Sequence, residues 1–425
     1  MSDPGAWPSE LRKRAATAVE AVRLVRSDQR IAVGASNAEP QRLVAALLDR
    51  ADELEGVEAL AWPGGFPTPL ADPELLGRIE LRLGVPNAHT REALDSGQAV
   101  YAPAHLHRFL GRLAAGTPPL DGALVMLGPP DAAGYCSFGV SAVNMKPAAE
   151  AARYVVAEIN DQMPRPRGDA AIHCSRIAAA VPVSAPLPEF PRSRPGEVER
   201  RIGERVAGIV PDGATIECGI GSLPDAVLAA LADHRGLAIR SGIIGDGVVA
   251  LAEAGALRER FDGVAPIAAG SVLGSRALYE FVDDSPLVEI HDGHWTHDTL
   301  RMAACEKFFA INSVIEMDLT GQANAEMIKG RLVAGIGGQS DFVRGARLSP
   351  GGGSILVMSA TAARGKRSRI VRELEPGVPV SLGRADVEWV VTEHGAVILE
   401  GLTLAERAAA LRSIAAPEFR GGLGG

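Results

Sequence analysis

The chain has 425 residues, of which 47% are hydrophobic and 22% charged, and its formal net charge is −9. A chain of this length exceeds the usual size of one hydrophobic core, so two domains are expected. The composition is that of a folded globular protein and excludes a largely disordered chain. Nucleic acid is not expected as a partner, because neutralising its phosphates requires clustered Lys and Arg.

The cysteines and the N-terminal residues indicate the cellular compartment in which the protein is expected. Cysteines occur at four scattered positions, which show neither zinc-site spacing nor a disulfide framework: Cys136, Cys174, Cys218 and Cys305. Basic residues at 12–14 are not followed by the apolar core or cleavage site of a signal peptide. No apolar run approaches the length that spans a bilayer. We therefore expect a reduced, cytoplasmic protein with no membrane partner.

Strand-like apolar runs alternate with helical stretches rich in Ala and Leu, which predicts α/β layers around mostly parallel sheets. Two stretches repeat one pattern. IAVG at 31–34 precedes Pro40 and an apolar helical run, and IECG at 216–219 precedes Pro224 and a similar run. Each predicts a strand, a glycine turn and a helix with proline near its first turn. The pattern is either a chance likeness of two βα units or an internal repeat, which would make the chain two related α/β halves.

A proline-rich segment at 181–195 separates these halves. Prolines at this density favour an extended linker. We therefore predict an N-terminal α/β domain at 1–180, a linker at 181–195 and a C-terminal α/β domain at 196–425.

The first half ends with GPPDAAGYCSFG at 128–139, followed by a predicted helix at 148–157. The loop is rich in turn formers and small polar groups, which suit either a ligand-facing connection or a purely structural crossover.

The second half carries a dense glycine cluster, LVAGIGGQSDF at 332–342, and a further one at 351–353 before a strand-like run at 354–358. Glycine lets backbone N–H groups approach a ligand closely. Such clusters after a strand either hold phosphates and developing oxyanions or simply form tight turns.

Together these features resemble the acetyl-CoA hydrolase/transferase family, which includes 4-hydroxybutyrate and succinyl-CoA:acetate CoA-transferases. The loop at 128–139 and seven further blocks carry the resemblance: EINDQMPRPRG (158–168), GATIECGIGSLPDAV (213–227), IGDGVVALAEAG (244–255), GSRALYEF (274–281), INSVIEMDLTGQANAE (311–326), GIGGQSDFVRGA (335–346) and VVTEHGAVILEG (391–401). The resemblance implies two related open α/β domains of the CoA-transferase type, with the active site between them and often in a homodimer. It implies an acyl-CoA thioester and a small carboxylic acid or water as partners. Coenzyme A would be a substrate moiety, with no permanently bound cofactor.

The resemblance also implies a mechanism. In the family a glutamate attacks the acyl-CoA to form an anhydride, which becomes a glutamyl-CoA thioester that an acceptor carboxylate consumes. The turn Gly337-Gly338-Gln339 matches the family's oxyanion turn. The remaining candidates lie in the same C-terminal domain, which would carry the CoA and acyl site: Gly219 and Gly221 in a glycine turn, and Arg344 and Lys366 for the nucleotide phosphates.

This sequence departs from the family at three positions. The alignment on IGDGVV at 244–249 places Gly242 where the family has its nucleophilic glutamate. His297 stands where the family usually carries an asparagine, and Glu217 where many relatives carry glutamine. Because glycine supplies no nucleophile, the glutamyl-CoA route is not expected.

The substituted residues leave several hypotheses open. His297 either acts as a base that activates water or simply hydrogen-bonds a carbonyl. Glu217 either takes a catalytic role or is a structural carboxylate paired with an arginine such as Arg240. We expect cleavage of an acyl-CoA with water, at the thioester or at the C–C bond of a β-oxoacyl-CoA. The alternatives are a CoA-transferase that uses another carboxylate, and a non-catalytic acyl-CoA-binding or scaffold subunit.

Three further histidines raise the question of a metal. The neighbours of His291, His294 and His394 supply no recurring ligand spacing, so no metal is expected.

Overall fold

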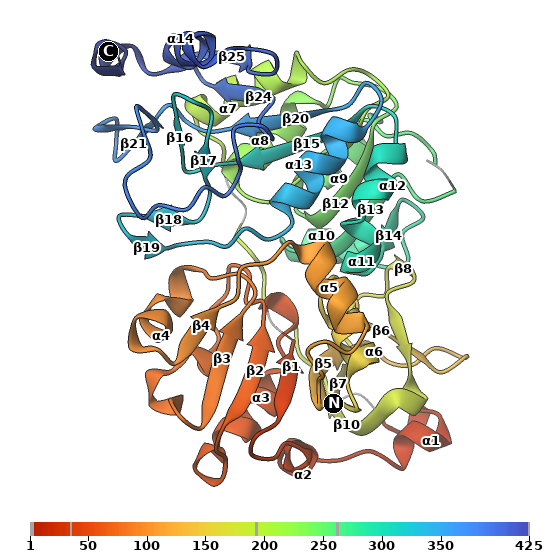
Figure 1. The fold of residues 1–425 in the computed structure, drawn as a ribbon. Coiled ribbons are helices and arrows are strands. Elements are labelled where there is room, and N and C mark those ends of the chain that lie inside the picture. The colour runs from red at the N-terminus through yellow and green to blue at the C-terminus, as the bar shows by residue number, and fades with distance from the viewer. Residues whose placement is uncertain (1–3, 35, 192–193, 261–262, 424–425) are drawn as a thin grey trace. The chain divides into compact units, whose positions relative to one another are not determined.

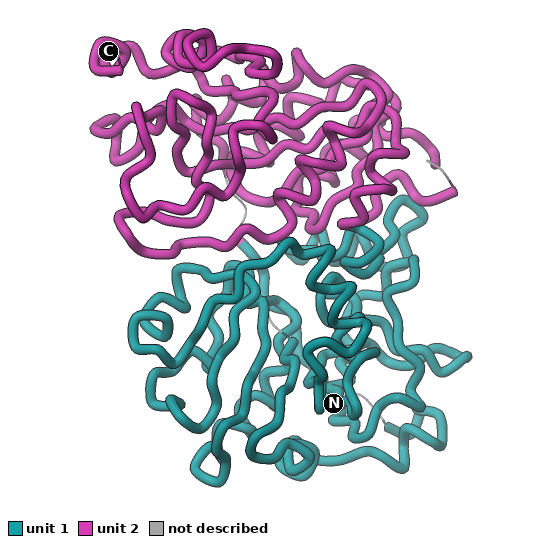
Figure 2. The backbone as a smooth tube through the Cα atoms, in the orientation of Figure 1, with its two compact units in different colours: residues 1–190, 269–296 teal, residues 191–268, 297–425 magenta. Residues whose placement is uncertain are grey.

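The computed structural model describes residues 4–34, 36–191, 194–260 and 263–423 (Figure 1). The chain divides into two compact units (Figure 2): unit 1 is Met1–Phe190 with Ala269–Thr296, and unit 2 is Pro191–Ala268 with His297–Gly425. Both units are α/β, so the predicted fold class is confirmed. Unit 1 takes Ala269–Thr296 from the part of the chain that the sequence division assigned to the C-terminal domain, and the division itself stays a prediction.

Unit 1 is built on a seven-stranded parallel sheet. In sheet order its strands are β10 (Ile177–Val183), β7 (Tyr154–Asn160), β5 (Gly122–Leu127), β1 (Arg30–Val33), β2 (Val57–Ala61), β3 (Ile79–Leu83) and β4 (Ala99–Tyr101). The central strands are continuous apolar runs, and every residue of β5 is buried. Such runs are typical of parallel strands that are covered on both faces.

The other elements of unit 1 are short. Its helices are α1 (Ser9–Arg12), α2 (Ala18–Ala21), α3 (Gln41–Leu48), α4 (Arg91–Ser96), α5 (Leu106–Ala114), α6 (Met145–Ala151), α10 (Arg276–Val282) and α11 (Gly293–Thr296). Strands β6 (Tyr135–Ser137) and β9 (Ala171–His173) pair antiparallel, and β8 (Arg167–Gly168) pairs in parallel with β14 (Val288–Ile290).

The predicted helix at 148–157 is wrong over its second half. Helix α6 ends at Ala151, Ala152 is extended, and Tyr154 begins strand β7. The run Tyr154-Val155-Val156 has aromatic and β-branched side chains that favour a strand. Pairing with β5 on one side and β10 on the other overrides the helix propensity of the alanines.

The proline-rich segment is only partly irregular. Residues 181–183 belong to β10, where Pro182 is tolerated because β10 is an edge strand. The described residues between β10 and α7 (Glu197–Ala207) lie in no helix or strand, and residues 192–193 of the predicted linker lie outside the described part of the chain.

Unit 2 has its own sheet. In order its strands are β25 (Gly395–Ile398), β24 (Trp389–Thr392), β20 (Gly353–Val357), β15 (Phe308–Ser313), β11 (Thr215–Cys218) and β12 (Ala238–Ile244). These strands are parallel except β25, which pairs antiparallel with β24. Strand β13 (Ile267–Val272), whose first two residues belong to unit 2, follows β12.

The repeated sequence pattern forms the predicted strand, turn and helix in both units. Strand β1 leads to α3 and lies between β5 and β2, and β11 leads to α8 (Ser222–Ala230) and lies between β15 and β12. From β11 the chain continues to β12 on one side, and β15 is added later on the other. The carboxyl end of β11 is therefore a topological switch point, where ligands of open α/β sheets bind.

Helices and small hairpins complete unit 2. The further helices are α9 (Gly247–Glu253), α12 (Thr299–Ala304), α13 (Gln339–Leu348) and α14 (Leu404–Ile414), and the short strands are β16 (Glu316–Asp318), β17 (Ala323–Asn324), β18 (Met327–Ile328), β19 (Arg331–Leu332), β21 (Thr361–Ala362), β22 (Arg367–Ser368) and β23 (Ile370–Val371). A buried cluster that includes Met302, Ala310 and Phe342 holds α12 and α13 on β15. None of the helices among the described residues is long and apolar enough to cross a membrane.

Candidate active site

Two candidate residues of unit 2 lie, together with Asn312, toward the carboxyl ends of three adjacent strands. Glu217 lies in β11, Gly242 in β12 and Asn312 in β15. The parallel pairs Ile216↔Ile239 and Glu217↔Ala310 set their register. Because side chains alternate along a strand, positions 217, 242 and 312 face the same side of the sheet. Helix α13 covers that side, since Phe342 packs in one cluster with Ala310.

The imidazole of His297 lies against two glycines at this edge. His297 is 3% exposed and directly precedes Asp298, the N-cap residue of α12. A Cβ atom added at Gly242 would lie 2.8 Å from both Cε1 and Nε2 of His297, and one at Gly338 would lie closer still to Cδ2 and Nε2. The His297 and Phe342 ring centroids are 4.6 Å apart. The ring therefore occupies space that side chains at 242 and 338 would need.

The glycine turn at 337–339 begins helix α13. Gly337 has φ +51°, a left-handed conformation that favours glycine, and Gly338 is the N-cap residue. The Gln339 amide Nε2 donates to the carbonyl of Ser313 over 3.1 Å. Its Oε1 is buried and has no hydrogen-bond partner among the described residues. A ligand with a donor group would satisfy that oxygen.

Glu217 is a buried carboxyl group with an amide partner. It is 5% exposed, and its Oε2 accepts a hydrogen bond of 2.7 Å from Nδ2 of Asn312. Burial raises the pKa of Glu217 to about 8, against the lowering effect of hydrogen bonds from Asn312 and the Ile311 backbone. The amide of Asn312 is thus one partner of this carboxyl group, and the pairing of Glu217 with Arg240 stays a hypothesis. At neutral pH Glu217 is mostly protonated and is a hydrogen-bond donor rather than a base.

The second glycine turn joins β11 to α8. Gly221 has φ +116° and is the N-cap residue of α8. Side chains added at Gly219 or Gly221 would meet no atom within 4 Å, so the turn borders open space. The hydroxyl of Ser241 lies 3.1 Å from the Cys218 carbonyl and 2.8 Å from that of Ile243, which ties β12 to the start of the turn.

Comparison with known proteins identifies the family. The acetyl-CoA hydrolase/transferase N-terminal domain matches residues 5–184, and the C-terminal domain of that family matches residues 274–424. The chain belongs to the acetyl-CoA hydrolase/transferase family. It is an enzyme of the CoA-transferase and acyl-CoA hydrolase type, and coenzyme A is a substrate moiety in this family.

Individual relatives agree with this assignment. The 4-hydroxybutyrate coenzyme A transferase of Clostridium kluyveri is 38% identical over 97% of each chain. RipA from Yersinia pestis has a similar crystal structure, with a TM-score of 0.89, 31% identity, and 98% of this chain and 97% of that chain covered. The 4-hydroxybutyrate CoA-transferase of Porphyromonas gingivalis has a TM-score of 0.83 and 33% identity, with 97% and 96% covered.

Both Glu217 and Gly242 fall in the stretch between the two matched domains. The replacement of the family nucleophile by Gly242 therefore stays a prediction, as do the cytoplasmic location and the homodimer.

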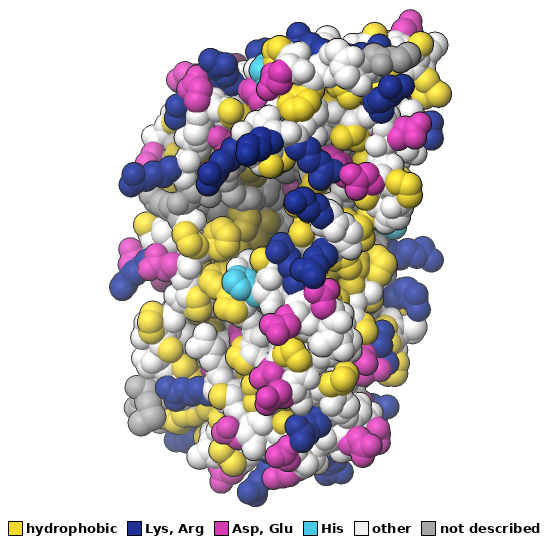
Figure 3. Space-filling model, turned by 90° about the vertical axis from the view of Figure 1, so that its left-hand side faces the viewer, with side chains coloured by type: hydrophobic (Ala, Val, Ile, Leu, Met, Phe, Trp, Pro, Cys, Tyr) yellow, Lys and Arg dark blue, Asp and Glu magenta, His cyan; other side chains and the backbone are white. Residues whose placement is uncertain are grey.

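The two basic candidates for the CoA phosphates lie on helix α13 and in a turn of unit 2. Arg344 lies on α13, half-exposed, with its Nη2 3.5 Å from Oδ2 of Asp386. Lys366 is exposed in the turn between β21 and β22. Lys and Arg side chains, drawn in dark blue, gather in a band on the face shown in Figure 3. The site residues that the structure brings together are thus His297, Gly242 and the 337–339 turn.

Sequence reasoning missed Asn312 and Phe342. Asn312 lies in a quoted family block, at the end of the apolar run FFAI, where a polar residue at the carboxyl end of a strand is a signal for a site. Phe342 follows the GGQ turn, and its apolar side chain predicts an ordinary core residue. No pattern in the sequence predicts that its ring contacts His297.

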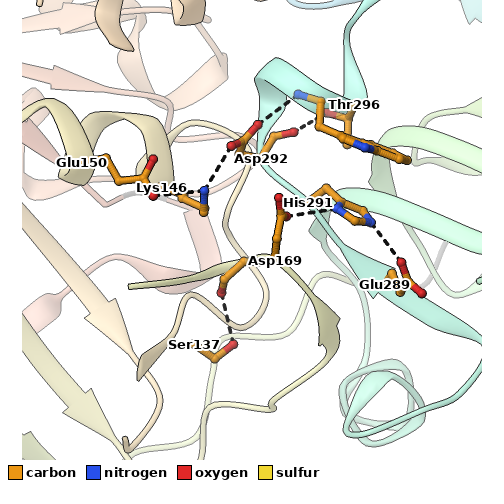
Figure 4. Close-up of polar contacts among 10 residues, drawn as sticks. Ser137, Lys146, Glu150, Asp169, Glu289, His291, Asp292 and Thr296 are labelled. Carbon is orange, nitrogen blue, oxygen red and sulfur yellow. Dashed lines mark hydrogen bonds and ion pairs between the residues drawn. The ribbon is translucent and has the colours of Figure 1, made fainter. Parts of the chain in front are cut away.

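One of the histidines considered as metal ligands, His291, lies in a polar network of unit 1. In unit 1, His291 Nδ1 lies 3.0 Å from Asp169 and Nε2 lies 3.2 Å from Glu289 (Figure 4). Its ring stacks on Trp295 with centroids 4.0 Å apart. The two ring nitrogens of His291 thus each lie beside a carboxylate, one on Asp169 and one on Glu289.

Figure 4 also shows Lys146 beside this histidine network. Its Nζ lies 3.1 Å from Glu150 and 3.3 Å from Asp292. Burial raises the pKa of Asp169, but the hydrogen bond from His291, together with its charge interactions with His291 and Lys146, holds that pKa below its usual value. The network is a set of paired charges within unit 1.

Proposed function

We propose that this enzyme cleaves an acyl-CoA with water and that His297 is the base that activates the water. The observation that supports the proposal is the contact of the His297 imidazole with Gly242, at the predicted position of the family nucleophile. If Gly242 holds that position, the residue that would attack the thioester is absent, and the His297 ring, a proton acceptor when neutral, lies there beside Gly338. Histidine is suited to this role because its ordinary pKa is close to neutral.

In the thioester reaction His297 takes a proton from water, and the hydroxide oxygen bonds to the acyl carbonyl carbon. The developing oxyanion accepts hydrogen bonds at the turn formed by Gly337, Gly338 and Gln339. The C–S bond then breaks, and the CoA thiolate leaves and takes up the proton from the imidazolium. The products are a carboxylic acid and free CoA.

In a β-oxoacyl-CoA, water activated by the same base can cleave a second bond, the one between the α and β carbons. Hydroxide then adds to the β-carbonyl, and the bond between the α and β carbons breaks. One product is a carboxylic acid, and the other is the enolate of a shorter acyl-CoA, which takes up the proton. The thioester survives in this reaction, so the two routes differ in whether CoA is released.

The other candidate residues have supporting roles in the proposal. Protonated Glu217 would hold Asn312 at the end of β15, and the open turn at Gly219 and Gly221 would accept the pantetheine arm. Arg344 and Lys366 would meet the nucleotide phosphates, which require cationic partners on a chain with net charge −9.

CoA transfer between carboxylic acids is the second candidate function. The printed name of the Clostridium kluyveri relative, a 4-hydroxybutyrate coenzyme A transferase, supports it. In this chain such a transfer would need another carboxylate as nucleophile. Glu217 is poorly suited, because a carboxyl group with a pKa of about 8 is largely neutral at pH 7. A non-catalytic acyl-CoA-binding subunit is the third reading.

The test incubates the protein with a panel of acyl-CoA and β-oxoacyl-CoA thioesters in water enriched in heavy oxygen. Free thiol, the acid product and the intact protein mass are followed, with borohydride to trap covalent adducts. The variants are His297→Ala and the control His394→Ala, a second histidine of unit 2 that lies beside Glu393.

The proposal expects heavy oxygen in the acid, no adduct, and loss of turnover in His297→Ala alone. An adduct on a carboxylate, with activity that depends on an added acid, would establish transfer instead. Binding without turnover of any thioester would leave the non-catalytic reading.

A further inference from the structure

We infer that Gly242, Gly338 and Phe342 form a slot that positions the imidazole of His297, which makes these three residues positioning residues for the base. The inference rests on the proposed role of His297, which it deepens. Gly242 lies in strand β12, Gly338 is the N-cap residue of α13, and Phe342 contributes its ring from the first turns of α13. His297 itself is supplied by the segment that leads into α12.

The two glycines form opposite parts of the slot. The Gly242 position meets Cε1 and Nε2 of the ring, and the Gly338 position meets Cδ2 and Nε2. The Nε2 edge is therefore turned toward the space between the two backbones. Neither glycine has a positive φ, so it is the presence of the ring, not the backbone conformation, that requires glycine at 242 and 338.

The third side and the backbone are also fixed. The Phe342 ring tilts 54° against the imidazole with centroids 4.6 Å apart. Behind the ring, Asp298 caps α12 by accepting a hydrogen bond of 2.9 Å from the Leu300 backbone N–H. With the backbone held by the cap and the ring held by the slot, His297 has little freedom to leave its place.

The slot also decides which chemistry the site accepts. A side chain at 242 and the imidazole of His297 compete for one volume, so the site holds either a nucleophile at 242 or the base at 297. With the base in place, the nucleophile cannot come from a side chain at 242, and in the proposed function it is water. Because general-base catalysis depends on orientation, a displacement of about 1 Å can cost about a hundredfold in rate.

The experiment is a double-mutant cycle on Gly242 and His297. It uses wild type, Gly242→Ala, His297→Ala and the double variant, with Gly383→Ala as the control because a Cβ at Gly383 meets no atom within 4 Å. Three quantities are measured: kcat and KM for acyl-CoA cleavage, the thermal midpoint, and the ring titration of His297 by NMR with isotope-labelled histidine. His297→Ala assigns the resonance among the nine histidines.

We expect Gly242→Ala to lower kcat by about 10- to 100-fold with little change in KM. It should also shift the His297 titration and lower the thermal midpoint, whereas Gly383→Ala does none of these. The double variant should have the same activity and thermal midpoint as His297→Ala alone. The methyl group that Gly242→Ala adds then has no imidazole ring to meet.

The inference is overturned if Gly242→Ala leaves the His297 titration unchanged, or if it destabilises the protein equally with and without the imidazole. These two readouts do not depend on turnover. If wild type cleaves no thioester, the proposed function fails while the stability cycle and the titration still decide whether the slot exists.

Discussion

The side-chain amide of Asn312 donates to Oε2 of Glu217 over 2.7 Å and joins the carboxyl ends of β15 and β11. The carboxyl group of Glu217 is buried, whereas Asn312 is partly exposed, and a charged carboxylate at the buried position would be poorly solvated. Burial keeps this carboxyl protonated through most of the neutral range, since its pKa is raised to about 8.

Glu217 should make the stability of the protein depend on pH. Its pKa is about 8 in the folded state and near 4.5 in the unfolded state. Because the unfolded chain ionises first, wild type loses stability as pH rises from about 4.5, and the loss is complete above about 8. Glu217→Gln keeps an oxygen for Asn312 and removes the titration. Urea unfolding across this range should therefore show the free energy of unfolding of the variant increasing relative to that of wild type as pH rises.

Glu418→Gln is the control for this series, because Glu418 is an exposed glutamate of unit 2. Its stability difference from wild type should stay flat with pH. An equally flat difference for Glu217→Gln would mean that Glu217 is ionised in the folded protein.

Gln339 should be needed for turnover more than for folding. Gln339→Glu keeps the side-chain length but removes the donor to the Ser313 carbonyl. It also places a negative charge in the first turn of α13, which helix N-termini favour and which offsets that loss. The same charge would repel a developing oxyanion. We expect the thermal midpoint to stay near that of wild type while kcat falls by about 100-fold or more. Melting curves and steady-state kinetics measured in parallel check this. A variant with wild-type kcat would show that Gln339 takes no part in turnover.

The predicted loss of the family nucleophile can be reversed by design. Gly242→Glu alone should give no covalent intermediate, because its Cβ would lie 2.8 Å from the His297 ring. Gly242→Glu with His297→Asn restores the pair of residues that the family pattern carries and removes the ring. Intact mass after incubation with an acyl-CoA should then show a trapped glutamyl adduct in the double variant only. Its absence there, in a folded protein, would argue that Gly242 does not occupy the nucleophile position.

The His291 network should stabilise unit 1 in a manner that depends on pH. Burial raises the pKa of Asp169, but His291 and Lys146 hold it below its usual value. A lowered carboxyl pKa stabilises the fold above the pKa of the unfolded state and loses that effect as pH falls. Asp169→Asn should therefore cost about 1 kcal/mol or less at neutral pH and less still in acid, because the Asp169 side chain is 55% exposed and solvent screens the ion pair.

Calorimetric or urea unfolding at neutral and acid pH measures this difference. The double variant of Asp169→Asn and His291→Gln should cost less than the sum of the single variants, because the two residues share one contact. Strict additivity would show that the contact contributes nothing to stability.

The sequence by itself determined the fold class and the family. The strand, glycine turn and helix at β1–α3 and at β11–α8 follow from local order, because each element depends on residues next to one another. Family blocks are local in the same sense, so the GGQ turn at 337–339 was found without a structure. The helix expected at 148–157 failed where strand pairing, a non-local effect, overrode local propensity.

Only the tertiary structure decided what the candidate residues do. No spacing predicts that His297 fills the side-chain space of Gly242 and Gly338, because that contact depends on how α12 and α13 pack on the sheet of unit 2. The pKa of Glu217 depends on its burial, and His291 meets Asp169 only because folding of unit 1 brings that distant residue to it. Chemistry at a site is set by neighbours in space, and those are fixed only when the chain has folded.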